Sequence, residues 1–298
     1  MHTRHGVLLE SLQAELGLGE QGQRDVQTAL HWALQSVPTS AGALARLPLA
    51  STAEEFGDLL FENDVCPLVN NIICVDTQDN LRRFVAATLP ARKNYTGSVP
   101  LAGWRSDCEF PSSSASDLIV EVNPECGFSY TANNDTMGEE GAFYIHNFPI
   151  SSARADRIGE LLKDRQNLTP ADFTAMQLDL KDLRALEMVP QLLDLCEGTE
   201  TPELLVVCDL LSAWDGIASV DSAAACVYYR FLDEFWPRDF LFEVLGDPVV
   251  NLLPLGAPGL NRFDISRFLA PESSWLVHQE ALKETVQNAL VRAVQSVT

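Results

Sequence analysis

Basic residues are scarce in this sequence. Its 298 residues include 20 lysines and arginines against 42 aspartates and glutamates, which gives a formal net charge of −22. Its few lysines, Lys93, Lys163, Lys181 and Lys283, form no basic stripe. Because binding to phosphates needs clustered Lys and Arg, this composition argues against nucleic acid and against an anionic membrane surface as partners.

Long apolar runs are absent as well. No stretch reaches the roughly 18 residues that predict a membrane-spanning helix. The first apolar stretch is interrupted by Glu10 and Glu15 and is not followed by a small-residue cleavage site, so it is not a signal peptide. That exclusion of a leader holds only if Met1 is the true start, which we doubt for the reasons given below.

The seven cysteines form no CxxC pair and no zinc-like grouping with histidine. Several lie in apolar runs, such as Cys74 in NNIICVD and Cys226 in SAAACVYY. We therefore expect buried free thiols, since free Cys is often buried. One or two disulfides remain an alternative if the protein is exported.

Three common site motifs are missing or lack their context. The sequence contains no GxSxG motif, so a nucleophile elbow has no support. The glycines of residues 17–22 match GxGxxG, but no strand precedes them, which favours a turn over a dinucleotide loop. His2 and His5 have the spacing of two metal ligands but no evident third ligand, so we interpret them as structural.

The chain changes character near residue 150. Residues 1–150 are predicted to be β-rich, with strands over 68–76, 81–89, 117–122 and 127–132 and one helix over 52–62 that is capped at Ser51 or Thr52. Residues 151–298 are predicted to be mainly helical, with helices over 151–164, 169–180, 219–235 and 273–297. Thr169 is the predicted cap of the second of these helices, and the last has an apolar face at Leu276, Leu282, Val286, Leu290 and Val294. The two parts are expected to share one core, and residues 27–36 fit a helix or a strand equally well.

Residues 127–135, GFSYTANND, carry two side-chain amides directly after a β-like run. Local chemistry favours a turn, because Asn and Asp tolerate a left-handed backbone and hydrogen-bond to their own main chain. A functional role for Asn133 or Asn134 is the alternative, and the rest of the chain bears on it.

Several stretches, in the correct order, resemble the penicillin acylase family of N-terminal-nucleophile amidases, which includes acyl-homoserine-lactone acylases. Residues 66–92 resemble the family's strand–turn–strand pattern with a P.R corner, and residues 97–104 resemble its G..P..GW segment. Further matches are residues 122–135 (NP..G.i..aNN), 151–162 (RA.RI..lL), 168–195 and, at the start, TRHG at 3–6 and LHW at 30–32. The resemblance identifies residues 1–298 as an internal part of the family's β-chain.

This resemblance implies an α+β fold, with part of an αββα sandwich in residues 1–150 and a mainly helical part packed on the same core in residues 151–298. It also implies hydrolysis of linear N-acyl amides through an acyl-enzyme. By register, Asn133 matches the asparagine whose amide contributes to the oxyanion hole, and Arg154 matches an arginine that orders the active site. A neutral NH₂ donor suits an oxyanion, and one such donor is worth about 2.7–4 kcal/mol.

The sequence also departs from the family pattern. The family's nucleophile is a Ser, Cys or Thr at the start of the β-chain, whose own α-amine acts as the base. This chain begins with Met1 and His2, and the Gly97-Ser98 pair lies downstream of where a cleavage junction belongs. Asp79 stands where the family usually has Gly, which would alter that turn.

Two hypotheses follow from these departures. Either the chain is part of an active acylase whose nucleophile lies on a segment outside residues 1–298, or it is a truncated, non-catalytic homologue that acts as a binding or structural protein. In both cases we expect residues 1–298 alone to be inactive. The expected partners are a small N-acyl amide and the remainder of an acylase polypeptide, without an organic cofactor. Calcium is a family expectation whose ligands the sequence does not assign, and export to the periplasm or medium would follow the family pattern.

Overall fold

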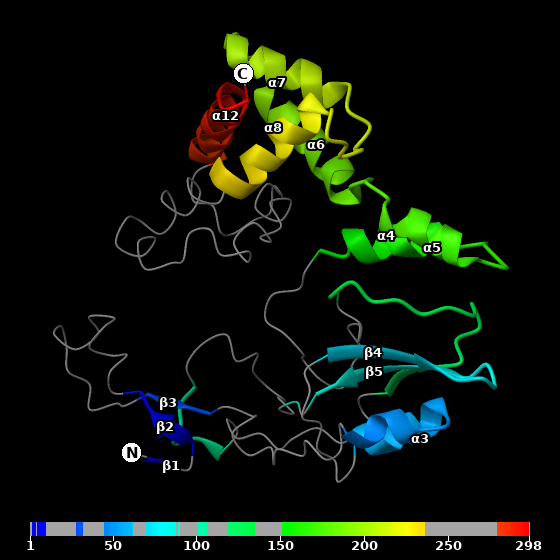
Figure 1. The fold of residues 1–298 in the computed structure, drawn as a ribbon. Coiled ribbons are helices and arrows are strands. Elements are labelled where there is room, and N and C mark those ends of the chain that lie inside the picture. Colours follow the sequence, from blue (N-terminus) through cyan, green and yellow to red (C-terminus); the bar gives the residue numbers. More distant parts are fainter. Residues whose placement is uncertain are drawn as a thin grey trace. The chain divides into compact units, whose positions relative to one another are not determined.

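The computed structural model describes ten ranges of the chain: 2–3, 5–9, 28–31, 45–61, 70–87, 89, 101–106, 119–134, 151–235 and 279–297. The chain divides into two compact units, Met1–Pro149 and Ile150–Thr298, and Figure 1 shows their elements. The division falls beside residue 150, where the sequence pattern changes. A core shared by the two units stays a prediction.

The described residues of the first unit form two antiparallel sheets. The larger has the order β4-β5-β6, formed by Asn70–Val75, Leu81–Ala86 and Ile119–Val122. The smaller has the order β1-β2-β3, formed by His2–Thr3, Gly6–Leu8 and Ala29–Leu30. Residues 29–30 of the segment that fitted either a helix or a strand are therefore strand.

Helix α3, Ala53–Leu60, packs on one face of the larger sheet. Of the two caps that the sequence allowed, Ser51 and Thr52, it is Thr52 that caps the helix, by accepting the amide of Glu55. Leu60 and Phe84 are fully buried at the contact between helix and strand. A Cβ added at Gly57 would lie 2.8 Å from the Phe84 ring, so this close approach of helix to strand depends on glycine. A short 3₁₀ helix, η2 at Leu47–Leu49, precedes α3.

The second unit is helical over its described residues. Its elements are α4 (Ala153–Leu162), α5 (Pro170–Gln177), α6 (Leu183–Cys196), α7 (Pro202–Ser212), α8 (Ala223–Arg230), the π-helical turn η6 (Phe231–Phe235) and α12 (Gln279–Gln295). The predicted start of α5 is confirmed: Thr169 and Asp172 form a capping box around Pro170. At α4 the Ser152 hydroxyl donates to the Asp156 carboxylate (2.6 Å) instead of capping the backbone.

The core of the second unit lies between α6, α7, α8 and α12. Leu192, Tyr228 and Leu290 are among its fully buried side chains. In α12 the predicted apolar face is confirmed at Val286 and Val294, whereas Leu276 lies outside the described residues. Each large apolar side chain buried in this way contributes about 1.5–3 kcal/mol relative to an exposed one.

The expectation of buried thiols is only partly correct. The five cysteines described by the structure are free, and Cys196 is buried, but Cys126 and Cys226 are exposed. In α8 the buried residues are Ala224, Ala225, Val227 and Tyr228. At 3.6 residues per turn, Cys226 falls on the opposite face, so its apolar neighbours in sequence are not its neighbours in space.

None of the described helices is long and apolar enough to cross a membrane.

Candidate active site

The candidate site is the loop that follows β6, residues 123–134. It begins at Asn123, whose backbone is left-handed (φ 47°). The Asn123 amide donates to the Leu81 carbonyl (2.8 Å), and the Asn123 side-chain oxygen accepts the Leu81 amide (2.8 Å). The first residue of the loop is thus bound to the first residue of β5.

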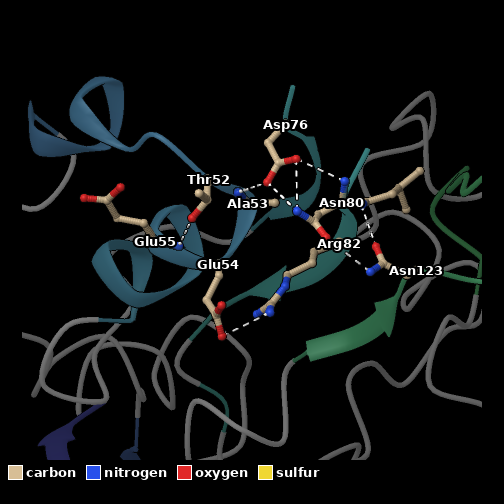
Figure 2. Close-up of polar contacts among 9 residues, drawn as sticks. Thr52, Ala53, Glu54, Glu55, Asp76, Asn80, Arg82 and Asn123 are labelled. Carbon is tan, nitrogen blue, oxygen red and sulfur yellow. Dashed lines mark hydrogen bonds and ion pairs between the residues drawn. The ribbon is translucent and has the colours of Figure 1, made fainter. Parts of the chain in front are cut away.

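The turn between β4 and β5 supports this attachment, as Figure 2 shows. Asp76 accepts hydrogen bonds from the amides of Gln78 (2.9 Å) and Asn80 (3.0 Å) and from the Asn80 side chain. Its second oxygen accepts the amide of Ala53 (3.1 Å), the first residue of α3. Asn80 in turn accepts from the Asn123 side chain (3.4 Å), so the turn, the helix and the loop are connected.

The Asp76 carboxylate is stabilised in its charged form. The side-chain hydrogen bond from Asn80 is the largest cause, and the amides of Ala53, Asn80 and Gln78 add to it against the desolvation of the group. Together they lower the pKa of Asp76 to about 2. The negative charge also lies at the N-terminus of α3, where it is favourable.

Asp79 occupies a left-handed position in the same turn, with φ of 62°. Glycine adopts this conformation most readily, which accounts for a family preference for Gly there. Asp is one of the few other residues that tolerate it. The departure at Asp79 is therefore compatible with a left-handed turn.

The middle of the loop differs from the sequence prediction. Residues 127–132 were expected to form a strand, yet Phe128–Thr131 belong to no strand among the residues described. Gly127 closes a turn with φ of 74°, its amide donating to the Pro124 carbonyl (2.9 Å). After it, the Ser129 hydroxyl donates to the side chain of Glu121, and the rings of Phe128 and Tyr130 stack with centroids 6.2 Å apart. Side-chain contacts hold this segment in place of a strand ladder.

The end of the loop has the turn geometry that the sequence predicted. Ala132 is buried, Asn133 is left-handed (φ 63°) and exposed, and the Asn134 side-chain oxygen accepts the amide of Ala132 (3.2 Å). The Asn134 side chain therefore stabilises the turn, while the Asn133 side chain is exposed to solvent. The role of Asn133 as an oxyanion donor stays a prediction.

Arg154 lies in the first turn of α4 and is exposed. Its neighbour Arg157 binds Asp179 through two hydrogen bonds of 2.8 Å, which raise the pKa of Arg157, and also contacts Glu160 (2.8 Å). Arg157 thus connects α4 to the segment after α5. Arg154 and Asn133 belong to different units, so their meeting in one site stays a prediction.

Sequence reasoning missed a buried arginine beside the loop. In LRRFVA, Arg82 and Arg83 point to opposite faces of β5: Arg82 contacts Glu54 (3.2 Å), and Arg83 is buried against Glu121. Alternation placed them on opposite faces, but only the packing of the sheet determines which face is covered. No feature of the sequence distinguished Glu121 from the other acidic residues of the chain.

Calcium ligands remain unassigned. Among the described residues, no group of three or more His, Cys, Asp or Glu side chains could hold a metal ion. His5, considered above as a ligand, bonds through Nε2 to the Gly103 carbonyl oxygen (2.6 Å). Calcium therefore stays a family expectation.

Comparison with known families bears on the resemblance directly. The family model described as "Penicillin amidase" matches residues 1–298, the whole chain. The chain belongs to the penicillin amidase family. A solved structure of the thermostable penicillin G acylase from Alcaligenes faecalis matches 99% of this chain with a TM-score of 0.63 at 17% identity, covering 57% of that chain. The predicted α+β fold of the N-terminal-nucleophile hydrolases is thereby confirmed.

Relatives in the penicillin amidase family include acyl-homoserine lactone acylases. QuiP of Pseudomonas aeruginosa is 26% identical over 265 residues, which is 81% of this chain and 30% of QuiP. PvdQ of Pseudomonas savastanoi is 27% identical over 131 residues, 42% of this chain and 15% of PvdQ. The matched part of the chain thus spans only 30% of the length of QuiP.

Proposed function

We propose that this member of the penicillin amidase family is part of an amidohydrolase that splits linear N-acyl amides into an acid and an amine. The observation that carries the proposal is the family match over residues 1–298. The names of its relatives favour an acyl-homoserine lactone as substrate, and penicillin-like or other N-acyl compounds belong to the same chemical class.

In this proposal the reaction is an acyl transfer in two steps. The hydroxyl or thiol of an N-terminal residue attacks the amide carbonyl, and the α-amine of that residue takes the proton. The C–N bond then breaks, the amine leaves with a proton, and water hydrolyses the acyl-enzyme. By family resemblance the nucleophile belongs to a segment of the acylase outside residues 1–298.

Asn133 is the group that this chain supplies to the reacting atoms. Its Nδ2–H would donate to the carbonyl oxygen as negative charge develops there. Three features support the role. Asn133 is exposed, its backbone is left-handed, and the hydrogen bond from the Ala132 amide to the Asn134 side chain closes the turn around it. A neutral amide stabilises the oxyanion without adding a net charge to the site.

Arg154 is proposed as the residue that orders the site. It lies one helical turn before Ile158 in α4, and the adjacent Arg157–Asp179 pair fixes the direction of that helix. A cation in the first turn of a helix is unfavourable for the helix itself, so its presence there calls for another role.

The test uses the native, mature protein that contains these residues. Its N-termini are first read by mass spectrometry, and its turnover of N-acyl chromogenic amides is then measured. We expect a mature chain that begins with Ser, Cys or Thr and extends into TRHG at residues 3–6, together with amide turnover. A protein that begins at Met1 or His2 and lacks turnover would be the non-catalytic homologue.

The variant Asn133→Gly tests the oxyanion role. Glycine keeps the left-handed backbone and removes only the amide, so we expect kcat to fall about 10²–10³-fold with the fold intact. Asn167→Gly is the matched control, because Asn167 is also exposed and left-handed (φ 54°) and is assigned no role. Unchanged turnover in Asn133→Gly would contradict the assignment.

A further inference from the structure

An ion pair between a buried arginine and a half-buried glutamate joins the two strands next to the candidate loop. Arg83 of β5 and Glu121 of β6 are direct register partners. The Arg83 Nε–H donates to Glu121 Oε2 (3.1 Å), and its Nη2 lies 3.0 Å from Oε1. The Arg83 side chain is only 8% exposed. This fork-to-carboxylate geometry fixes both side chains, because two parallel bonds leave neither group free to rotate.

The same carboxylate also holds the loop. The Ser129 hydroxyl donates to Glu121 Oε2, the oxygen that accepts from Arg83 Nε. Ser129 is four residues before Asn133, so at most about 14 Å of extended chain separates them. The loop is thus anchored to the sheet shortly before the turn that carries the Asn133 amide.

The charge of Glu121 determines the direction of these bonds. Hydrogen bonding from Arg83, and then from Ser129, lowers the pKa of Glu121 against its desolvation, so the carboxylate is ionised near neutral pH. An ionised carboxylate only accepts hydrogen bonds, which makes Ser129 the donor. Opposite Arg83 on β4 lies Ile73, which is apolar, and so the charged groups of the cluster are Arg83 and Glu121.

Two buried polar atoms make the region sensitive to change. Within the part of the chain that the structure describes, Arg83 Nη1 and Thr131 Oγ1 have no hydrogen-bond partner. Loss of Glu121 would leave a buried guanidinium without its carboxylate, which costs more than the pair itself contributes. With Arg83 buried, the stability of the sheet therefore depends on the presence of Glu121.

We propose that Arg83, Glu121 and Ser129 form a positioning network that sets the conformation of residues 128–134 and thereby the aim of the Asn133 amide. They are positioning residues and touch no reacting atom. The catalytic importance of this loop conformation rests on the proposed function. The effect of the network on the loop conformation can be tested without any activity measurement.

The first test measures amide hydrogen exchange in the full chain. Ser129→Ala and Glu121→Gln are expected to speed exchange in residues 128–134 about tenfold, as for the loss of one charge-assisted hydrogen bond. Ser129→Thr keeps the hydroxyl and should return the exchange close to the wild-type rate. Glu54→Gln, which breaks the contact to Arg82 on the other face of the sheet, is the matched control and should leave residues 128–134 unchanged.

Exchange outside the loop separates positioning from general destabilisation. α5, α6 and α7 belong to the second unit and should exchange at wild-type rates in all four variants. Unchanged exchange of residues 128–134 in Ser129→Ala would overturn the proposal. A uniform increase over the whole chain would also overturn it, because it would show a global loss of stability.

The second test is a double-mutant cycle in the native acylase. Ser129→Ala should lower kcat at unchanged KM, and it should have no further effect once Asn133→Gly is present, because the two act through one group. If Asn133→Gly leaves kcat unchanged, the proposed function fails. The hydrogen-exchange measurement then still tests whether the network sets the loop conformation. If Asn133→Gly lowers kcat and Ser129→Ala multiplies that loss, positioning through Asn133 is wrong.

Discussion

His5 and Gly103 are 98 residues apart in sequence, yet the His5 Nε2–H donates to the Gly103 carbonyl oxygen at 2.6 Å. The two residues belong to the TRHG and G..P..GW segments that carried part of the family resemblance. A Cβ at Gly103 would lie 3.2 Å from His5 Cδ2, so a side chain there would press on the imidazole. The contact gives a structural reason for both residue types.

His5→Ala is expected to destabilise the protein by about 0.5–1.5 kcal/mol, the typical net contribution of one hydrogen bond. Gly103→Ala should also destabilise it, because the new methyl group meets the imidazole ring. Combined with His5→Ala, the Gly103→Ala change should cost less than alone, since the ring is gone. Urea unfolding of the three variants measures this, and strictly additive effects would contradict the contact.

Arg157 and Asp179 form a bidentate pair in which each side chain is 22% exposed. Arg157→Met should destabilise the protein by about 1.5–3 kcal/mol, because it leaves the Asp179 carboxylate without its main donor. Arg165→Met is the matched control: Arg165 makes a single contact to Asp172 (2.7 Å), and its side chain is 43% exposed. That solvent-screened pair should contribute less to stability than the Arg157–Asp179 pair. Equal losses in urea unfolding would contradict the difference in burial and geometry.

Gly198 and Gly216 both have left-handed backbones, with φ of 74° and 79°. An added Cβ at Gly198 meets open space, whereas at Gly216 it would lie 2.8 Å from Leu186 Cδ2 and 3.3 Å from the Asp182 carbonyl oxygen. Gly198→Ala should therefore cost about 1–2 kcal/mol from backbone strain alone. Gly216→Ala should cost about 1 kcal/mol more, the lower end for overpacking, because the partly exposed Leu186 can move aside.

Leu186→Ala provides the control for this prediction. In that background the extra cost of Gly216→Ala should shrink, because its nearest contact has been removed, while the cost of Gly198→Ala should not change. Thermal or urea unfolding of the variants measures the difference. Equal costs for the two glycine variants in the wild-type background would show that backbone strain is the whole effect.

Asp76 should contribute to the stability of the protein against acid. Its pKa in the folded chain is lowered from 3.8 to about 2, so its contribution is complete above about pH 4 and is lost as the pH falls toward 2. Asp76→Asn should make the free energy of unfolding less dependent on pH in that window. Asp79→Asn, in the same turn, is the control and should keep the wild-type slope. A wild-type slope in Asp76→Asn would contradict the hydrogen-bond network of Figure 2.

Much of the fold could be predicted from local patterns. The helix starts at Thr52 and Thr169 were confirmed because a cap depends on side chains only three residues away. Likewise, the buried face of α12 follows from helical spacing alone. The family and its fold were predicted from ordered motif matches, and the whole-chain family match confirms them.

Part of the candidate site could not be predicted, because it depends on contacts between distant segments. The turn at Asn133 was predicted, since Asn favours a left-handed backbone by its own chemistry. The strand over 127–132 was wrong, because β propensity says nothing of whether a partner strand is in reach. Instead of pairing in a strand, this segment is held by the hydrogen bond from the Ser129 hydroxyl to the Glu121 side chain.

The sequence by itself determined the family, through the order of its motifs along the chain. It also determined the α+β pattern and the residues that cap helices and form turns, because these depend on neighbours a few residues apart. Only the tertiary structure decided that Arg83 is buried while Arg82 is half-buried, and that Glu121 joins the sheet to the loop of Asn133. The physical reason is that alternation assigns two residues to opposite faces of a strand, whereas the packing of α3 and of the loop determines what covers each face.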